Sequence, residues 1–501
     1  MMLYEPFITQ EQKAVIEANK DLLVIAGPGT GKTYTLLLKI KTLLENGLPP
    51  EKILILTFSL KTCQELRERL SRLGIKEAKV DTFHGLAYDL YRDFYQKEPR
   101  LIDEKEKTSL LKKLFSGERN LLKNSDQKIQ YFDYLEKNGL IDFDLLLNKA
   151  ISLINPENLR EYYLFLDEFQ DLSPEILDFL KSFKEATWIL FGDPNQSIYG
   201  FRGVNLAKIQ NFLQTHKPHL QILTLTESFR CKEEILKRAN QFKASPWKIP
   251  PFRSKHSGGI IQGFIFPNTY EEKDFLVNLV QNILGGTQLE RARHTTFAPS
   301  DIFILSRIKR VSEPLIEAFQ KEGIPVALPE EEAQKLKDEI NQIVERIKVF
   351  KEPLPEIIND VSPFLKNIFQ NWRGLLERDQ EKFLFYLKGL SSEDLIFPKL
   401  EGVNFLTIHA SKGLEAEVVI LYGGEEGLIP FTLFRDYDLD EEKRILYVAL
   451  TRAKGSFYFT ATQKRKIFHY ELTQGLSGWL KTLPYKEFPK RPPKPKQIDL
   501  F

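Results

Sequence analysis

A glycine-rich octet near the start of the chain constrains its fold more than any other stretch. It reads Ala26-Gly27-Pro28-Gly29-Thr30-Gly31-Lys32-Thr33, and it follows an apolar run at residues 22–25 and precedes a helical pattern. A strand, a glycine-rich turn and a helix in this order form a phosphate-binding loop. The glycines let backbone N–H groups face a triphosphate, and the helix dipole adds to the attraction. The sequence therefore predicts a nucleotide site, with Lys32 on the β and γ phosphates and Thr33 on Mg²⁺.

Further apolar runs alternate with helical patterns along the chain. They lie at residues 53–56, 163–166 and 187–191, and then at 260–266, 302–305, 404–408, 418–422 and 457–462. Strands that are separated by helices favour a parallel, doubly wound sheet, and ligands bind beyond the carboxyl ends of its strands. Two stretches, 85–160 and 330–398, are helical in pattern and lack clear strands. We expect an α/β protein with two sheet domains, each interrupted by a helical insertion.

This pattern predicts the domain boundaries. The first sheet domain takes residues 1–84 and 161–225, and its insert takes 85–160. The second sheet domain takes residues 226–329 and 399–485, and its shorter insert takes 330–398. Residues 486–501 are rich in proline and lysine and are expected to form an extended tail.

Two polar clusters follow strands of the first predicted sheet. Asp167-Glu168-Phe169-Gln170-Asp171 follows the run at 163–166, and the segment 192–203 follows the next one. A carboxylate at the end of a strand can hold Mg²⁺ while its neighbour orients the attacking water, which assigns these roles to Asp167 and Glu168. In the second cluster, Gln196 can sense a γ-phosphate. Each cluster alone also fits a simple polar loop, but together with the glycine-rich octet they indicate a site for phosphoryl transfer.

Charge and cysteine content limit the partners of the chain. Its 71 Lys and Arg residues against 69 Asp and Glu residues give a net charge of +2, so a polyanion must be held by local basic surface. Cys63 and Cys231 lack the spacing of a metal site and are expected to stay reduced. The chain also lacks an apolar run long enough to span a membrane. We therefore expect a cytoplasmic protein without membrane partners.

The order of these motifs resembles that of the superfamily 1 DNA helicases of the UvrD, Rep and PcrA type over nearly the whole chain. The segments that carry the resemblance are 7–15, 26–33, 56–61, 81–84, 167–171, 192–203, 226–230, 407–415 and 441–454. The resemblance implies two RecA-like domains with ATP and Mg²⁺ in the cleft between them. The second insert is short, so the chain resembles a compact form of the family.

The resemblance also implies roles in the nucleotide site. Lys32, Asp167, Glu168, Gln196, Arg230 and Arg452 would form the catalytic set, with Arg230 at the γ-phosphate and Arg452 as the arginine finger. An arginine finger commonly contributes ~10³–10⁵ in rate. Four further residues would contact the rest of the nucleotide: Gln12 and Phe229 at the adenine, Tyr34 at the base in place of a more usual arginine, and Glu415 at the ribose.

A path for single-stranded DNA follows from the same resemblance. It would use Phe58, Lys61, Thr82, Phe83, His84, Tyr199, Phe201, Arg202, His409 and Lys412. Aromatic side chains can stack on successive bases without reading a sequence, at about 1–3 kcal/mol per base. The alternative for each aromatic residue is packing in the core.

These assignments predict an ATP-dependent single-stranded DNA translocase and helicase that moves 3′ to 5′. Such a monomer would act on tailed duplexes in repair or replication, associated with the nucleoid. One alternative is a translocase that strips proteins from single strands with little unwinding. Another is an adaptor whose nucleotide cycle only gates binding.

The last five residues, Gln497-Ile498-Asp499-Leu500-Phe501, resemble the peptide by which bacterial proteins dock on the replicative sliding clamp. A few apolar anchors and one amide would carry the binding energy. We expect a clamp to be a partner of the chain.

Overall fold

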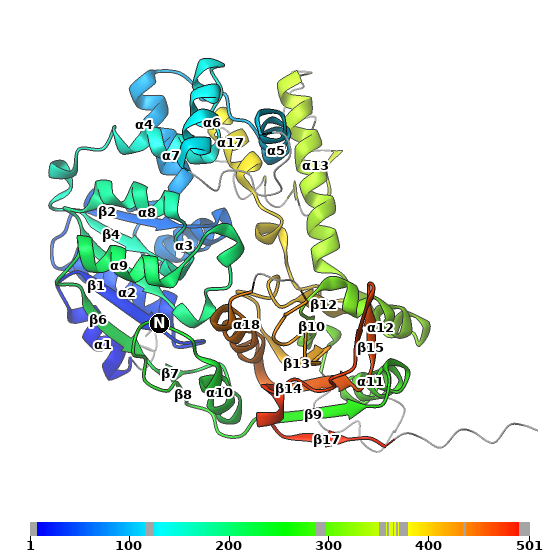
Figure 1. The fold of residues 1–501 in the computed structure, drawn as a ribbon. Coiled ribbons are helices and arrows are strands. Elements are labelled where there is room, and N and C mark those ends of the chain that lie inside the picture. The colour runs from blue at the N-terminus through cyan, green and yellow to red at the C-terminus, as the bar shows by residue number, and fades with distance from the viewer. Residues whose placement is uncertain are drawn as a thin grey trace, which may run out of the picture.

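The computed structural model describes residues 8–115, 125–285, 297–349, 357, 360–363, 365–366, 369, 379–433 and 437–489. In this part of the chain, two parallel β-sheets lie beside one another, one in each half of Figure 1. This arrangement confirms the predicted α/β fold class with two doubly wound sheets. The clamp-like peptide Gln497–Phe501 lies outside the described residues.

The first sheet has the order β3-β2-β4-β5-β1-β6, and all neighbouring strands are parallel. Its strands are β1 (Leu22–Ala26), β2 (Ile53–Thr57), β3 (Lys79–Thr82), β4 (Tyr163–Leu166), β5 (Thr187–Gly192) and β6 (Gln221–Leu225). Because β1, β5 and β4 are neighbours and parallel, the loops after them meet at one edge. That edge therefore gathers the octet and both polar clusters.

The residues of β1 alternate between two apolar layers. Leu22 and Val24 share one cluster with α1 (Gln10–Glu17), α2 (Lys32–Glu45) and α3 (Leu60–Arg72). Leu23 and Ile25 share the other with α8 (Pro174–Leu180) and α9 (Leu206–His216). Burial of both faces explains why the inner strands are continuous apolar runs in the sequence.

The second sheet has the order β11-β12-β10-β13-β14-β9-β17, again with parallel neighbours. Its strands are β9 (Ile260–Phe266), β10 (Ile302–Ser306), β11 (Val326–Ala327), β12 (Val403–Thr407), β13 (Ala416–Tyr422), β14 (Ala453–Thr462) and β17 (Tyr485–Glu487). The helices α11 (Thr269–Ile283) and α12 (Lys309–Lys321) cover one face. The other face packs on α10 (Glu233–Ala239) and α18 (Leu439–Thr451).

The cluster on this second face is the same apolar cluster that covers one face of the first sheet. The two sheets are thus joined by a continuous buried layer, with α18 at its centre (Figure 1).

The two helical inserts contact one another. The first holds α4 (Phe83–Tyr95), α5 (Glu104–Leu114), α6 (Ser125–Lys137) and α7 (Phe143–Ile151), and the second holds α13 (Pro329–Val349) and α17 (Gln380–Gly389) (Figure 1). On α17, the Tyr386 hydroxyl donates to Asp81 Oδ1 at 2.5 Å, and Lys382 Nζ lies 2.7 Å from Asp89. The short second insert is therefore fixed to the first half of the molecule.

The sequence patterns located the inner strands but missed four edge or short strands of the two sheets, which are β3, β6, β11 and β17. The β17 strand also corrects the predicted tail. Lys486 and Glu487, assigned to an extended tail from residue 486, pair with β9. Two small sheets were missed as well: β7 (Glu227–Ser228) with β8 (Arg253–Ser254), and β15 (Arg465–Ile467) with β16 (Tyr470–Leu472). Among the described helices, none combines the length and apolar character needed to cross a membrane.

Candidate functional site

The glycine-rich octet forms the turn between β1 and α2, as predicted. Gly29 and Gly31 have left-handed φ angles of +69° and +78°, which explains why glycine is needed there. The Thr30 hydroxyl donates to Gly27 O at 2.9 Å and closes the loop on itself. Gln12 also contacts the loop, because its Nε2 donates to Thr30 O at 3.3 Å. The loop is thus preformed, with its N–H groups at the N-terminus of α2.

Lys32 joins this loop to the end of β4. Its Nζ lies 2.9 Å from Asp167 Oδ1 and also contacts Glu168 Oε1. Burial disfavours the Lys32 charge, but the two carboxylates outweigh it, and the Lys32 pKa is raised. Burial also disfavours the Glu168 charge and would raise its pKa, but the charges of Lys32 and Lys412 outweigh burial and lower the Glu168 pKa to about 2. Glu168 is therefore ionised at neutral pH, as a group that orients water must be.

A chain of hydrogen bonds leads from Glu168 to the second sheet. Gln170 Nε2 donates to Glu168 Oε2 at 2.6 Å, and Gln170 Oε1 accepts from Asp193 N at 3.1 Å. Gln196 Nε2 then donates to Asp193 Oδ2 at 3.1 Å, and Arg452 Nη2 donates to Gln196 Oε1 at 3.3 Å. Lys32 and Arg452 therefore belong to one connected site, although 420 positions separate them in the sequence.

Arg452 ends α18 in a buried position, with only 1% of its surface exposed. Its guanidinium donates to Leu414 O at 2.9 Å and Val448 O at 3.1 Å, and among the described residues it forms no ion pair within 4 Å. Burial, aided by the nearby charge of Arg230, lowers the Arg452 pKa to about 10. The group stays protonated at neutral pH, and its direct partners are neutral oxygen atoms, while the charge of Glu415 acts on it from nearby. Such a cation is suited to bind a developing negative charge.

Arg230 is fixed against the octet by its neighbours. Ser228 Oγ donates to Pro28 O at 2.6 Å, and Phe229 N donates to Gly29 O at 2.9 Å. A Cβ on Gly29 would lie 2.3 Å from Arg230 Cβ, so only glycine fits this contact. The Arg230 guanidinium pairs with Glu415. Beside this ion pair lies a cavity of about 650 Å³, and Arg230, Glu415 and Phe229 form part of its lining.

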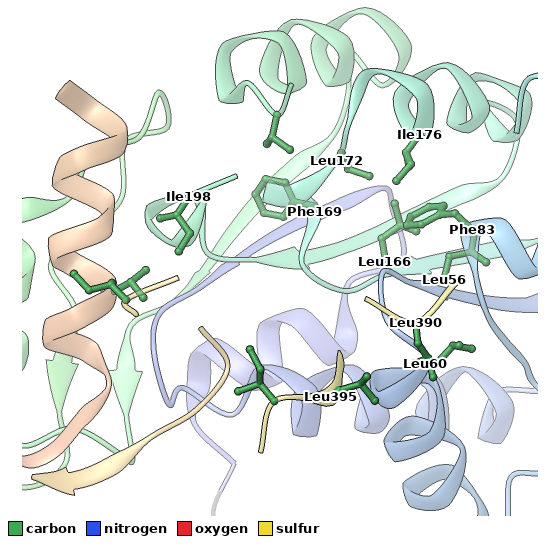
Figure 2. Close-up of a cluster of buried hydrophobic side chains, with 14 of the residues drawn as sticks. Leu56, Leu60, Phe83, Leu166, Phe169, Leu172, Ile176, Ile198, Leu390 and Leu395 are labelled. Carbon is green, nitrogen blue, oxygen red and sulfur yellow. The ribbon is translucent and has the colours of Figure 1, made fainter. Parts of the chain in front are cut away.

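Eight of the ten predicted DNA residues fall into two groups. The first group, Thr82, Phe83 and His84, makes contacts within the protein. Thr82 Oγ1 caps α4, the Phe83 side chain is 1% exposed, and the centres of the His84 and Phe143 rings lie 5.0 Å apart. In this conformation Phe83 cannot stack on a base, because its ring lies in the core, 5.2 Å from Phe58 (Figure 2). Core packing, the alternative considered for the aromatics, therefore describes Phe83.

The second group surrounds Tyr199. The Lys412 ammonium lies 4.4 Å from the centre of the Tyr199 ring, and the Arg202 guanidinium lies 4.7 Å from it. Phe201 is 69% exposed and lies 5.9 Å from the His409 ring. Burial, with nearby cations, lowers the His409 pKa to about 4, so this ring is neutral at pH 7. Phe201 therefore offers an open stacking surface beside basic side chains.

Lys412, predicted to contact DNA, is paired with a carboxylate inside the protein. Its ammonium lies 2.6 Å from an Asp171 carboxylate oxygen, and both side chains are at most 10% exposed. Burial raises the Asp171 pKa to about 6 despite this partner. Lys412 thus ties the loop after β12 to the loop after β4, and its charge is already paired.

A segment missed by the sequence analysis, residues 390–397, lies over this surface; we call it the acidic connector. Glu393 pairs with Arg202 at 2.6 Å, and Lys61 lies 4.1 Å from the centre of the Phe397 ring. Leu390 and Leu395 lie beside Leu60 in the apolar cluster of Figure 2. The connector therefore contacts two of the cations predicted to bind DNA, Arg202 and Lys61.

The polar face of α18 was missed as well. Glu441 accepts from Gly200 N at 2.8 Å, Arg444 Nε donates to Ser197 O at 2.6 Å, and the Tyr447 hydroxyl donates to Asp193 Oδ2 at 2.9 Å. These three residues recur at every third position and so share one face of the helix, and this spacing was the available signal. Through them α18 holds the loop that carries Gln196 and Tyr199.

Comparison with known proteins agrees with this geometry. The family model described as "UvrD/REP helicase N-terminal domain" matches residues 8–130 and 118–219, and the "UvrD-like helicase C-terminal domain" matches residues 330–464. The chain is 25% identical to the ATP-dependent DNA helicase Rep of Buchnera aphidicola subsp. Schizaphis graminum, over 95% of this chain and 96% of the relative. It is 23% identical to the PcrA helicase of Staphylococcus epidermidis, over 95% and 86%.

A probable DNA helicase II homolog of Rickettsia felis is 27% identical over 93% of both chains. The alignment with the Buchnera protein spans 636 positions, so that relative carries residues without a counterpart in this chain of 501. Together with the shared order of motifs, these matches show that the chain belongs to the UvrD/Rep family of helicases.

Proposed function

We propose that this protein is an ATP-dependent DNA helicase that moves 3′ to 5′ along single-stranded DNA in repair or replication. The observation that carries the proposal is the hydrogen-bond chain from Glu168 through Gln196 to Arg452, because it joins both sheets over one site. The names of the relatives, which are DNA helicases, support DNA as the substrate.

ATP and Mg²⁺ fit the residues of the site. The octet offers N–H groups with left-handed glycines and the ammonium of Lys32, and Arg230 lies beside it. Among the described residues, no group of three His, Cys, Asp or Glu side chains could hold a metal alone. This is expected for Mg²⁺, which such sites hold through one or two protein oxygens together with phosphate oxygens and water. Thr33 and Asp167 would supply the protein oxygens, and the ion would neutralise charge on the phosphates.

In the proposed cycle of ATP binding and hydrolysis, the two halves of the molecule each contribute a cation to the γ-phosphate. Lys32 begins α2, which packs on the first sheet, whereas Arg452 ends α18, which packs on the second, so a γ-phosphate between them would draw the halves together. Its loss would let them part. Gln196 contacts Arg452 and lies three residues before Tyr199, so a shift at the nucleotide would move the aromatic surface. We further propose that the halves follow the predicted domain boundaries, corrected at β17, and that a monomer does this work at the nucleoid.

The test is a pair of assays on the full chain. We expect single-stranded DNA to stimulate ATP hydrolysis, and a duplex with a 3′ single-stranded tail to be opened faster than one with a 5′ tail. RNA duplexes of the same design test the choice of DNA. Strong stimulation without opening would favour the protein-stripping translocase, and little stimulation would favour the adaptor.

The acidic connector yields a prediction about DNA affinity. In Glu393→Gln, Arg202 loses its carboxylate partner and becomes available to a phosphate. We expect tighter binding of single-stranded DNA, and a slope of log K against log salt that is steeper by roughly 0.7, the value for one added phosphate contact. Fluorescence anisotropy at several salt concentrations measures both. Glu381→Gln, which removes an exposed carboxylate from α17, is the matched control; equal affinities for both variants would contradict the prediction.

The last five residues yield a second prediction. Removing Gln497–Phe501 should leave DNA-stimulated ATP hydrolysis unchanged and abolish binding to a bacterial sliding clamp, measured by surface plasmon resonance. An unchanged clamp affinity of the shortened chain would refute the docking role of this peptide.

A further inference from the structure

Glu415 lies between two cations at the edge of the 650 Å³ cavity. One carboxylate oxygen pairs with the Arg230 guanidinium, and the other lies 2.9 Å from Lys454 Nζ. Burial alone would raise the Glu415 pKa, but Arg230 and Lys454 outweigh it and the pKa is lowered. The carboxylate is therefore ionised and held from two sides.

The backbone places Lys454 at this position. In the parallel pair of β13 and β14, Ala416 is in register with Ala453, and Ala416 N donates to Arg452 O at 3.0 Å. Lys232 N donates to Lys454 O at 2.9 Å. Lys454 is thus fixed on both sides of the strand, next to Glu415, and it was absent from the residues predicted from the sequence.

Arg230 has two competing partners under the proposed function. It pairs with Glu415 here, but the proposal assigns its guanidinium to the γ-phosphate, and one planar group cannot be paired fully with both. If Arg230 moves to the phosphate, Glu415 loses one of its two cations. Lys454 is then the closest cation that remains on it.

We propose that Lys454 is a positioning residue that holds the Glu415 carboxylate oriented toward the ribose hydroxyls once Arg230 engages the triphosphate. This inference rests on the proposed function. A hydroxyl that donates to a held carboxylate binds more strongly than one that donates to a mobile, water-exposed carboxylate. Lys454 would therefore set how well the site distinguishes ribose from a sugar without hydroxyls, without itself touching the nucleotide.

The experiment compares ATP with 2′,3′-dideoxy-ATP in steady-state hydrolysis by the full chain. We expect the wild type to prefer ATP by about 10-fold in kcat/KM, the scale of a hydrogen bond to a charged acceptor. In Lys454→Met the preference should fall to about twofold or less, mainly through a higher KM for ATP. Lys454→Arg keeps a cation beside Glu415 and should restore most of the preference.

Lys255→Met is the matched control. Lys255 lines the same cavity, but its ammonium pairs with Glu227 at 2.7 Å. The control removes an equal charge and should keep the wild-type preference. A wild-type preference in Lys454→Met would overturn the inference, as would an equal loss in both variants or no preference in the wild type. Because the readout is a ratio, a partly folded variant still gives a valid result. Absence of ATP hydrolysis by the wild type would instead refute the proposed function.

Discussion

Replacing Arg452 with methionine is expected to lower kcat for ATP hydrolysis by about 10³-fold, the lower end of what an arginine finger contributes. The stability of the variant should not fall in parallel. Since burial and Arg230 lower the Arg452 pKa to about 10, the folded protein disfavours this charge at every pH below that value. The change to methionine removes the unfavourable burial of the charge, and it also removes the hydrogen bonds that the guanidinium donates to neutral carbonyls. The midpoint of thermal unfolding should stay near that of the wild type or rise.

Opposite responses of turnover and stability would mark Arg452 as a functional rather than a structural cation. Arg444→Met is the matched control, because Arg444 lies buried on the same helix and also donates to two carbonyls, those of Ser197 and Ala244. Arg444 holds the loop that carries Gln196 but would not touch the nucleotide, so Arg444→Met should lower turnover far less than Arg452→Met does. A large drop in the unfolding midpoint of Arg452→Met, with turnover preserved, would show that Arg452 only anchors the end of α18.

The parts of the site that were predictable are local in the sequence. The octet lies between β1 and α2, and its left-handed glycines, Lys32 and the strand before them are all found within twelve residues. The carboxylates after β4 were found for the same reason, since a buried strand gives a continuous apolar run that ends at a polar residue. Local patterns of this kind need no knowledge of the rest of the fold.

The missed strands lack that signal. The first four residues of β6 are exposed or only half-buried, and all three residues of β17 are exposed. Each becomes a strand only because a neighbouring strand offers its backbone groups, β1 for β6 and β9 for β17. Pairing at the edge of a sheet is a property of the assembled fold, so neither apolar content nor alternation reveals it.

The missed contacts are distant in the chain. Lys412 and Asp171 are 241 residues apart, and Tyr386 and Asp81 are 305 apart. From sequence alone, Lys412 in a helicase-like motif reads as a free cation, and Phe83 after a strand reads equally well as a stacking or a core residue. Only the packing of the two inserts and of the two sheets decides between these readings.

Replacing Lys32 with alanine is expected to reduce ATP hydrolysis by ~10³-fold or more, because the octet loses its charge opposite the phosphates. Burial raises the Glu168 pKa, but Lys32 is the first of the groups that outweigh it and bring the value from an ordinary 4.5 to about 2. A lowered carboxyl pKa stabilises the fold above pH 4.5, and this stabilisation is lost as the pH falls towards 2. The variant should therefore be less stable than the wild type above about pH 4.5, and the difference should shrink in acid.

Thermal unfolding of both proteins between pH 3 and pH 7 measures this difference, and a coupled ATPase assay measures the turnover. Lys41→Ala is the control, because Lys41 lies on the same helix, is 48% exposed and pairs with Glu45 at the next turn. It should match the wild type in both experiments, since such surface pairs contribute little. Near-normal ATP hydrolysis by Lys32→Ala would refute the assignment of the octet as the phosphate-binding loop. A stability difference that grows in acid would show that Lys32 is not the main partner of Glu168.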